Sequence, residues 1–334
     1  MQLATSCKIL LLHLSCLMTS IAALSNAAEI NKSITITKTE NGFVFFEQDC
    51  HILSYQQQVK SLEGEFPRSN YVHPLSDLEG QELTEDFPQD HLHHRGIFWA
   101  WPQVWVGNQK VGDSWLAQNF HWEITAAKIV ETIGEPPALQ IALLWKSDQW
   151  LDGSGTPLPI VRESVTLQAF PRATDHRCVD FSIRLQALTE QVRIGGSEND
   201  KGYGGFSPRI RTPDDLIFTS AKGVATPQRV AVANSPWMDM SGTFGDNQQI
   251  SGITVLCHPS SPGNPPPWIL RQMGSMQNAV YPGRHPVTLP TDATLNLNYR
   301  LVIHRDRVTA AQIQQWYNDY SRSNVHKALQ EEIP

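Results

Sequence analysis

The stretches that decide the fold are two long alternating runs, Ile160-Val161-Arg162-Glu163-Ser164-Val165-Thr166-Leu167-Gln168-Ala169-Phe170 and Cys178-Val179-Asp180-Phe181-Ser182-Ile183-Arg184-Leu185-Gln186-Ala187-Leu188. Apolar residues such as Leu167 and Phe181 fall on one face, and polar residues such as Gln168 and Asp180 fall on the other. Successive side chains of a strand point to opposite faces, so each run predicts a long antiparallel strand with one solvated face. Several such strands predict a large sandwich or barrel.

Shorter segments extend this prediction along the chain. We expect further strands at residues 33–39, 43–47, 51–55, 122–125, 127–132, 139–146, 253–257 and 295–304, with a hairpin turn at Asn41-Gly42. Residues 63–89 are rich in Pro, Gly and acidic side chains and predict a long loop. One helix is predicted near the C terminus, where Thr309 can cap a segment with apolar residues at helical spacing. The fold class is therefore all-β, a large antiparallel β-sandwich with a C-terminal helix.

Composition and the N-terminal segment limit the class of protein. We interpret residues 1–28 as a signal peptide, because Lys8 precedes the apolar run Ile9–Leu24 and Ser25-Asn26-Ala27 suits cleavage after Ala27. A retained membrane anchor is the alternative. Residues 29–334 show no linker or repeat and predict a single domain, periplasmic or secreted, with no membrane span after signal removal. The net charge is −7 without a basic block, so we expect no nucleic-acid partner. Three cysteines remain in the mature chain, which permits at most one disulfide and favours buried thiols.

Groups that carry chemistry gather in Asp90-His91-Leu92-His93-His94-Arg95-Gly96, just before the apolar run Ile97-Phe98-Trp99-Ala100-Trp101. In an extended chain His91 and His93 would point to one face and His94 to the other. The His-x-His spacing suits zinc or another divalent metal, so we predict His91 and His93 as metal ligands that need partners from elsewhere. Metal-free acid–base catalysis by the histidines is the alternative, since imidazole titrates near neutrality.

Several distant residues are predicted to complete the site. Arg95 suits recognition of carboxylate or sugar hydroxyls, and Glu198 is a candidate acid–base carboxylate. Many tryptophans favour a sugar ligand, because indole rings stack on pyranose faces. The remaining predicted site residues are Tyr71, His73, Arg209, His258, Trp268 and Arg271. No serine nucleophile elbow and no nucleotide fingerprint is present.

Four stretches carry a resemblance to a known family: residues 71–75, residues 86–96, Gly204-Gly205-Phe206 with Arg209, and His258-Pro259 with Pro267-Trp268 and Arg271. Together they span about residues 35–320, and the chain resembles the bacterial PmoA family, named for methane oxygenase. Leu92 stands where such proteins often have proline. The resemblance implies a soluble β-sandwich of the galactose-mutarotase-like supersandwich type with a role in sugar catabolism.

The function predicted from the sequence is an exported carbohydrate-active enzyme, a lyase, hydrolase or epimerase, that cleaves or isomerises a glycoside or oxidised sugar. His91, His93, His94, His258 and Glu198 are its candidate catalytic residues, and Arg95, Arg209, Arg271, Trp268, Tyr71 and His73 its candidate substrate-binding residues. The expected partner is a small molecule or oligosaccharide, and a divalent metal is the candidate cofactor. Two alternatives stay open: a non-catalytic carbohydrate-binding protein, and a metal-dependent oxygenase as the family name suggests.

Overall fold

Two large antiparallel sheets form the body of the computed structural model, which describes residues 33–245 and 248–323. The predicted signal segment, residues 1–28, lies outside the described residues. The first sheet has eight strands in the order β1 (Ile34–Lys38), β2 (Gly42–Glu47), β3 (Cys50–Gln56), β6 (Tyr71–Leu75), β7 (Ile97–Ala100), β15 (Gly205–Pro208), β21 (Asn278–Val280) and β20 (Trp268–Ile269).

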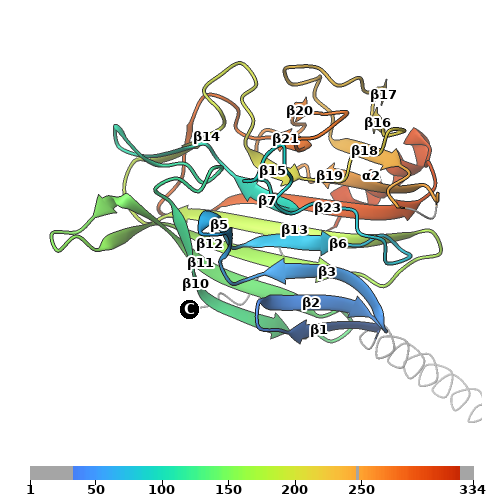
Figure 1. Cartoon of the computed structure of the whole chain (residues 1–334), viewed down its shortest axis with the longest axis horizontal. Helices are drawn as coiled ribbons and strands as arrows, with labels where there is room; N and C mark the ends of the chain where they lie inside the picture. The colour runs from blue at the N-terminus through green and yellow to red at the C-terminus, as the bar shows by residue number, and fades with distance from the viewer. Residues whose placement is uncertain (1–32, 246–247, 324–334) are drawn as a thin grey trace, which may run out of the picture.

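The second sheet has nine strands, and the long alternating runs form its centre. Its order is β10 (His121–Val130), β11 (Ala138–Leu151), β12 (Pro157–Ala169), β13 (His176–Ala187), β23 (Leu295–Arg305), β19 (Ser251–Cys257), β18 (Trp237–Gly242), β16 (Ile217–Ser220) and β17 (Gly223–Val224). A smaller sheet joins β22 (Val287–Thr288), β14 (Val192–Gly195), β8 (Gln103–Val106) and β9 (Gln109–Gly112), and β4 (Lys60–Leu62) pairs with β5 (Glu65–Arg68). In Figure 1 the two large sheets are layered on one another. The predicted all-β sandwich is confirmed.

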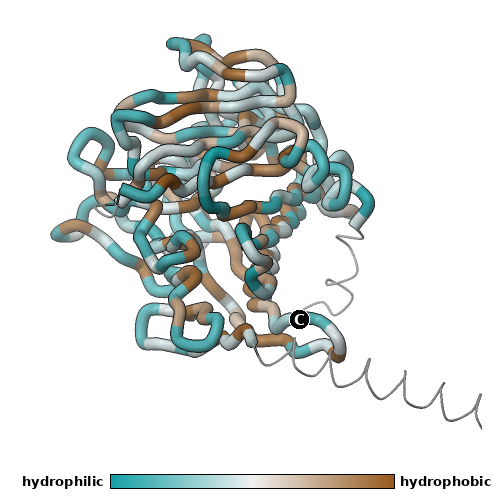
Figure 2. Tube along the Cα trace, turned by 90° about the vertical axis from the view of Figure 1, so that its right-hand side faces the viewer, coloured by the Kyte–Doolittle hydropathy of each residue, from teal (hydrophilic) through white to brown (hydrophobic). Residues whose placement is uncertain are grey.

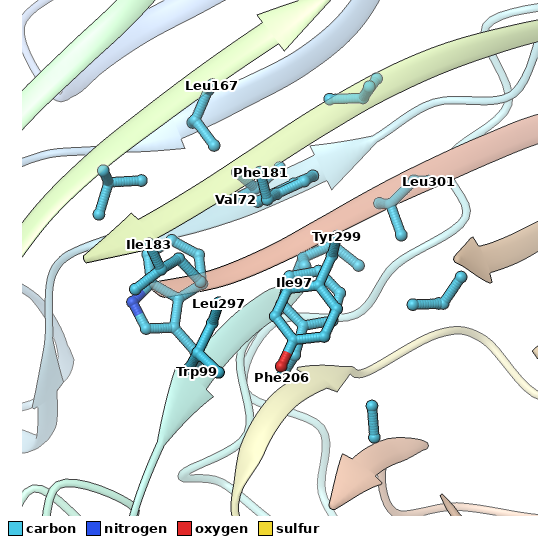
Figure 3. Close-up of a cluster of buried hydrophobic side chains, with 14 of the residues drawn as sticks. Val72, Ile97, Trp99, Leu167, Phe181, Ile183, Phe206, Leu297, Tyr299 and Leu301 are labelled. Carbon is cyan, nitrogen blue, oxygen red and sulfur yellow. The ribbon is translucent and has the colours of Figure 1, made fainter. Parts of the chain in front are cut away.

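The core lies between the two sheets, where every second residue of each strand is apolar. Figure 3 shows Val72, Ile97, Trp99 and Phe206 of the eight-stranded sheet against Leu167, Phe181, Ile183, Leu297, Tyr299 and Leu301 of the nine-stranded sheet. These side chains are buried because the pairing of β12 with β13 puts Leu167 opposite Phe181 on the inner face. In Figure 2 many peripheral loops are hydrophilic, while hydrophobic segments run along strands inside the molecule.

One carboxylate interrupts this apolar interior. Glu163 of β12 is fully buried, and it accepts hydrogen bonds from the indole N–H groups of Trp99 and Trp145 and from the side-chain amide of Asn70. Asn70 in turn accepts from the hydroxyl of Tyr55 at 3.0 Å. Burial raises the pKa of Glu163, and the three donors oppose that rise. Because Trp99 and Asn70 belong to the eight-stranded layer, Glu163 ties the two sheets together.

The C-terminal helix α2 (Ala310–Ser321) covers part of the outer face of the nine-stranded sheet. Thr309 caps it as predicted, since its hydroxyl accepts a hydrogen bond from the backbone N–H of Gln312 at 3.2 Å. Ile313, Trp316 and Tyr320 of the helix pack in one cluster with Trp237, Leu256 and Val302 of the sheet. Within the described residues, no helix has both the length and the apolar character needed to cross a membrane.

Two expectations about this fold are wrong. Residues 63–89 are not one long loop, because β6 runs through them and lies between β3 and β7 in the eight-stranded sheet. Its prolines and polar residues obscured a strand whose Tyr71, Val72 and Leu75 are buried by neighbours distant in sequence. Cys50 is exposed rather than buried, whereas Cys257 is buried, and the described cysteines form no disulfide.

Candidate functional site

Three imidazoles meet in a turn between β6 and β7. His94 stacks on His91 with ring centroids 4.6 Å apart, and His93 meets His94 edge-on at 4.5 Å. The backbone N–H of His94 donates to the carbonyl of His91 at 2.9 Å, so the segment turns instead of extending. The predicted alternation of the histidines between two faces is therefore wrong. A turn brings all three rings into mutual contact, where a strand would have separated them.

Asp90 orients His91 and is itself held in place. The Nδ1 of His91 lies 2.8 Å from Oδ2 of Asp90, while Arg209 donates to both Asp90 oxygens at 2.9 and 2.6 Å. Burial alone would raise the pKa of Asp90, but hydrogen bonds from Arg209, His91 and the backbone of Ser275 hold it well below its usual range. An ionised carboxylate only accepts, so Nδ1 of His91 carries a proton, and in the neutral form of the ring Nε2 presents a lone pair.

The other two imidazoles are neutral at physiological pH. Burial lowers the pKa of His93 to about 4, and the positive field of its neighbours His91, Arg68 and Arg95 adds to the effect. The pKa of His94 is lowered further for the same reasons, burial first. The His94 side chain is buried, and its Nδ1 has no hydrogen-bond partner among the described residues. The side chain of His91, in contrast, is 42% exposed and can meet a ligand from solvent.

A mostly buried aromatic cluster extends from the histidines. The ring of His94 lies 5.8 Å from Phe98 and 5.7 Å from Trp115, and Trp115 lies 4.8 Å from half-buried Tyr203. These rings belong to a cluster on the outer face of the eight-stranded sheet, because Phe98 of β7 points away from the core that Ile97 and Trp99 enter. Tyr203 was not predicted as a site residue, although it lies in the glycine-rich segment Gly202-Tyr203-Gly204-Gly205.

Two of the three arginines predicted to bind substrate, Arg95 and Arg209, instead bond to other parts of the protein. Arg95 is fully buried, donates to the carbonyls of Leu92 (2.7 Å) and Phe66, and lies 3.3 Å from the ring centroid of Phe87. Arg209 is buried as well, and its guanidinium is occupied by Asp90 and by Glu85 at 2.8 Å. The substrate-binding predictions for both residues are corrected: Arg209 positions Asp90, and Arg95 fixes the turn.

Tyr71 and His73 lie in β6, beside the turn. Tyr71 is buried and its hydroxyl donates to Asp86 at 3.3 Å, so a direct substrate contact is not available to it. His73 is half-buried with Nδ1 at 3.0 Å from Thr84 Oγ1, and burial lowers its pKa. Both side chains support the segment that carries the histidines and stand outside the group of contacting imidazoles.

Two predicted residues, His258 and Trp268, are absent from this cluster. The ring of His258 packs 5.1 Å from Tyr320 of α2, on the outer face of the nine-stranded sheet. The turn that carries His91, His93 and His94, here called the histidine turn, adjoins the outer face of the eight-stranded sheet. The core therefore lies between His258 and this turn. Trp268 is fully buried and donates to the carbonyl of Ser235 at 2.9 Å, which removes it as a stacking platform.

Arg271 and Glu198 also lie apart from the imidazoles. The guanidinium of Arg271 donates to the carbonyls of Gln228 (2.8 Å) and Arg229 (3.0 Å) and stabilises a loop. The side chain of Glu198 is 65% exposed and pairs with Lys110 at 3.3 Å. The ion pair with Lys110 places Glu198 at the surface, outside the group of contacting imidazoles.

The predicted metal pair lacks further ligands. His91 and His93 meet edge-on at 5.7 Å. Across residues 33–245 and 248–323, no group of three or more His, Cys, Asp or Glu side chains is arranged to hold a metal ion. Zinc sites need three or four such ligands. The structure thus gives His91 and His93 no third protein ligand of these types.

The fold and the turn define an all-β sandwich protein that presents a carboxylate-oriented imidazole beside two neutral ones. The chain belongs to a family of unknown function, DUF6807, whose model matches residues 45–318. No curated protein matches the chain. Neither finding links it to the PmoA family, and that resemblance stays a prediction.

Proposed function

We propose that the chain is an exported carbohydrate-active enzyme in which His91 acts as a general base. The observation that carries the proposal is the hydrogen bond between His91 Nδ1 and Asp90 at 2.8 Å on a side chain that is 42% exposed. A carboxylate behind Nδ1 fixes the tautomer and stabilises the imidazolium that forms when Nε2 takes a proton. His93 and His94 are uncharged, so they add no repulsion against that new charge.

Proton abstraction fits the described residues better than glycoside hydrolysis. Hydrolysis uses a pair of carboxyl groups, one of them protonated, on either side of the scissile bond. Near the histidines, Asp90 and Glu85 are both engaged by Arg209. A base alone suffices for epimerisation or β-elimination of an oxidised sugar. His91 Nε2 takes the proton next to a carbonyl, and the C–H electron pair moves onto that carbonyl oxygen. The enolate then regains that proton at carbon from the His91 imidazolium, or it expels a β-substituent, which leaves with the electron pair of its bond to carbon and takes the proton.

The substrate class rests on two further points. The sequence resembles a family associated with sugar catabolism, and the half-buried ring of Tyr203 packs on buried Trp115, which contacts His94. Aromatic faces beside hydrogen-bonding groups suit the apolar faces and hydroxyls of a pyranose. Export is part of the proposal because of the predicted signal peptide.

Deuterium exchange tests this function. The purified protein is incubated in D₂O with a panel of keto-sugars, uronic acids and their glycosides, and NMR follows deuterium entering the carbon next to the carbonyl. We expect exchange with at least one panel member. His91→Gln and Asp90→Asn should slow it about 10²–10⁴-fold, the usual contribution of general base catalysis. Glu198→Gln, at an exposed ion pair, is the matched control and should leave the rate unchanged.

Two results decide against the proposal. Undiminished exchange by His91→Gln would show that another group is the base. Tight binding of a panel sugar with neither exchange nor conversion would instead favour the non-catalytic carbohydrate-binding alternative.

A further inference from the structure

A pocket lined by both polar and apolar side chains lies on the outer face of the nine-stranded sheet. Its volume is about 460 Å³, within the range typical of small-molecule sites. Strands β10, β11, β12, β13 and β23 form its floor, the segment with Glu135 and Pro136 forms one wall, and Tyr320 and Ser323 at the end of α2 form another. Figure 1 shows these strands running side by side.

The centre of the floor is a row of polar side chains across four strands. The strand pairings place Gln140 opposite Thr166, Thr166 opposite Ser182, and Ser182 opposite Asn298. All four line the pocket, and all are nearly inaccessible to solvent. Ser182 donates to the side-chain carbonyl of Asn298 at 2.7 Å. Side-chain amides and hydroxyls both donate and accept hydrogen bonds, so a row of them in register suits a ligand that is itself rich in hydroxyl groups.

Among the described strand residues that line the floor, the next row carries one acidic and one basic side chain, whose charges cancel. Gln168 stands opposite Asp180, and Asp180 opposite Arg300. Arg300 donates to both carboxylate oxygens of Asp180, at 2.6 and 2.8 Å. Its guanidinium also lies 5.2 Å from the ring centroid of Phe170 and 4.7 Å from that of Tyr320. The floor is therefore electrically neutral, which disfavours phosphate or carboxylate ligands, and two aromatic rings stand beside it.

This pocket and the histidine turn lie on opposite outer faces of the sandwich. Leu167 and Phe181 enter the core between the sheets, so their neighbours Thr166 and Ser182 point to the outer face of the nine-stranded sheet. The turn adjoins the outer face of the eight-stranded sheet. A ligand bound in the pocket would therefore not block access to the histidine turn.

We propose that the pocket is a separate binding site for a neutral, hydroxyl-rich ligand, a monosaccharide or one unit of an oligosaccharide. Amide and hydroxyl groups bond its hydroxyls, while the half-buried ring of Phe170 borders its apolar face. This goes beyond the proposed function, because the pocket holds no imidazole and binds without catalysis. It gives the protein a means to retain a saccharide chain whose reactive unit is processed elsewhere.

Titration calorimetry with the full mature chain tests the inference. The probes are neutral mono- and disaccharides of glucose, galactose, mannose, xylose and rhamnose, together with inorganic phosphate as a charged comparison. The test variant is Thr166→Val with Gln168→Leu, which removes two polar groups from the floor at similar volume. Ser164→Ala on the same strand and face, outside the pocket, is the matched control. Circular dichroism verifies folding, and Thr166→Val alone is the milder variant if the double variant misfolds.

We expect one or more neutral sugars to bind, with affinity at least fivefold weaker in the double variant, about twofold or more weaker in Thr166→Val, and unchanged in Ser164→Ala and His91→Gln. Binding lost in His91→Gln but kept in the floor variants would place the sugar at the histidine turn and overturn the inference. Binding of phosphate alone, or of none of the probes, would also overturn it. These outcomes are independent of the exchange assay, so this inference and the proposed enzyme can fail separately.

Discussion

Replacing Glu163 by Leu should destabilise the protein more than any change in its surface ion pairs. The substitution removes both carboxylate oxygens and leaves three donors, Trp99 Nε1, Trp145 Nε1 and Asn70 Nδ2, without an acceptor in the core. A buried unsatisfied donor costs about 1–3 kcal/mol, which sums to about 3–9 kcal/mol before relaxation. Relief of the desolvation cost of the carboxylate offsets part of this. We expect about 3–5 kcal/mol, as for other broken buried pairs.

Equilibrium urea unfolding measures this loss. With an m-value of about 3 kcal/mol/M, the midpoint should fall by about 1–2 M. Far-UV circular dichroism is the appropriate signal, because Trp99 and Trp145 themselves contact the substituted side chain. Glu163→Gln retains one oxygen but sets an amide N–H against an indole N–H, so an intermediate loss of about 1–3 kcal/mol is expected.

The control is Glu123→Gln, which breaks an ion pair with Lys146 on the same sheet. The side chain of Glu123 is 49% exposed, and exposed pairs contribute about 0–1 kcal/mol. If Glu163→Leu lost no more stability than Glu123→Gln, the carboxylate would not tie the sheets, and the account of the core would be refuted.

Three further predictions concern pH, packing and metal. Burial alone would lower the pKa of His304, but its bonds to Asp239 and two carbonyls raise the pKa above 6.5. The stabilisation from the charged imidazole is therefore present below about pH 6.5 and is lost as the pH rises through the pKa of the folded state. Urea unfolding should show lower stability at pH 9 than at pH 6, and the pH dependence should be flatter in Asp239→Asn. Gly96→Ala should cost about 3 kcal/mol or more by the same measurement, because its Cβ would lie 1.9 Å from the Val72 carbonyl oxygen, whereas Gly153→Ala has open space and should be neutral. Chelation with EDTA should leave deuterium exchange unchanged; stoichiometric iron or copper in the purified protein would support the oxygenase alternative.

The histidine turn was predictable from the sequence only in part. The cluster of imidazoles before a buried strand was visible in the sequence, and the structure does bring His91, His93 and His94 into contact. Their arrangement was not visible, because a turn and a strand place alternate side chains differently. Arg209 was predicted to lie near the histidines, and it does, but its predicted role was to bind substrate. Only the tertiary structure shows that Asp90 and Glu85 accept the hydrogen bonds of its guanidinium.

Trp268 and His258 were predicted as site residues, but the structure places both away from the three histidines. Trp268 was predicted to bind the sugar, yet its side chain is fully buried in the core. His258 resembled the other histidines in type, but it directly follows β19, which belongs to the other sheet. A single sequence does not report which sheet a strand joins, because sheet order depends on pairing between distant segments.

The sequence by itself determined the all-β class, the long central strands and the capped C-terminal helix. These follow from periodicity and capping, which are local properties of neighbouring residues. Tertiary structure alone decided that β6 lies inside a sheet, that Glu163 joins the layers, and that Gln140, Thr166, Ser182 and Asn298 form one row across four strands. Each of these depends on strand register, which the whole sandwich selects by burying one face of every strand at once.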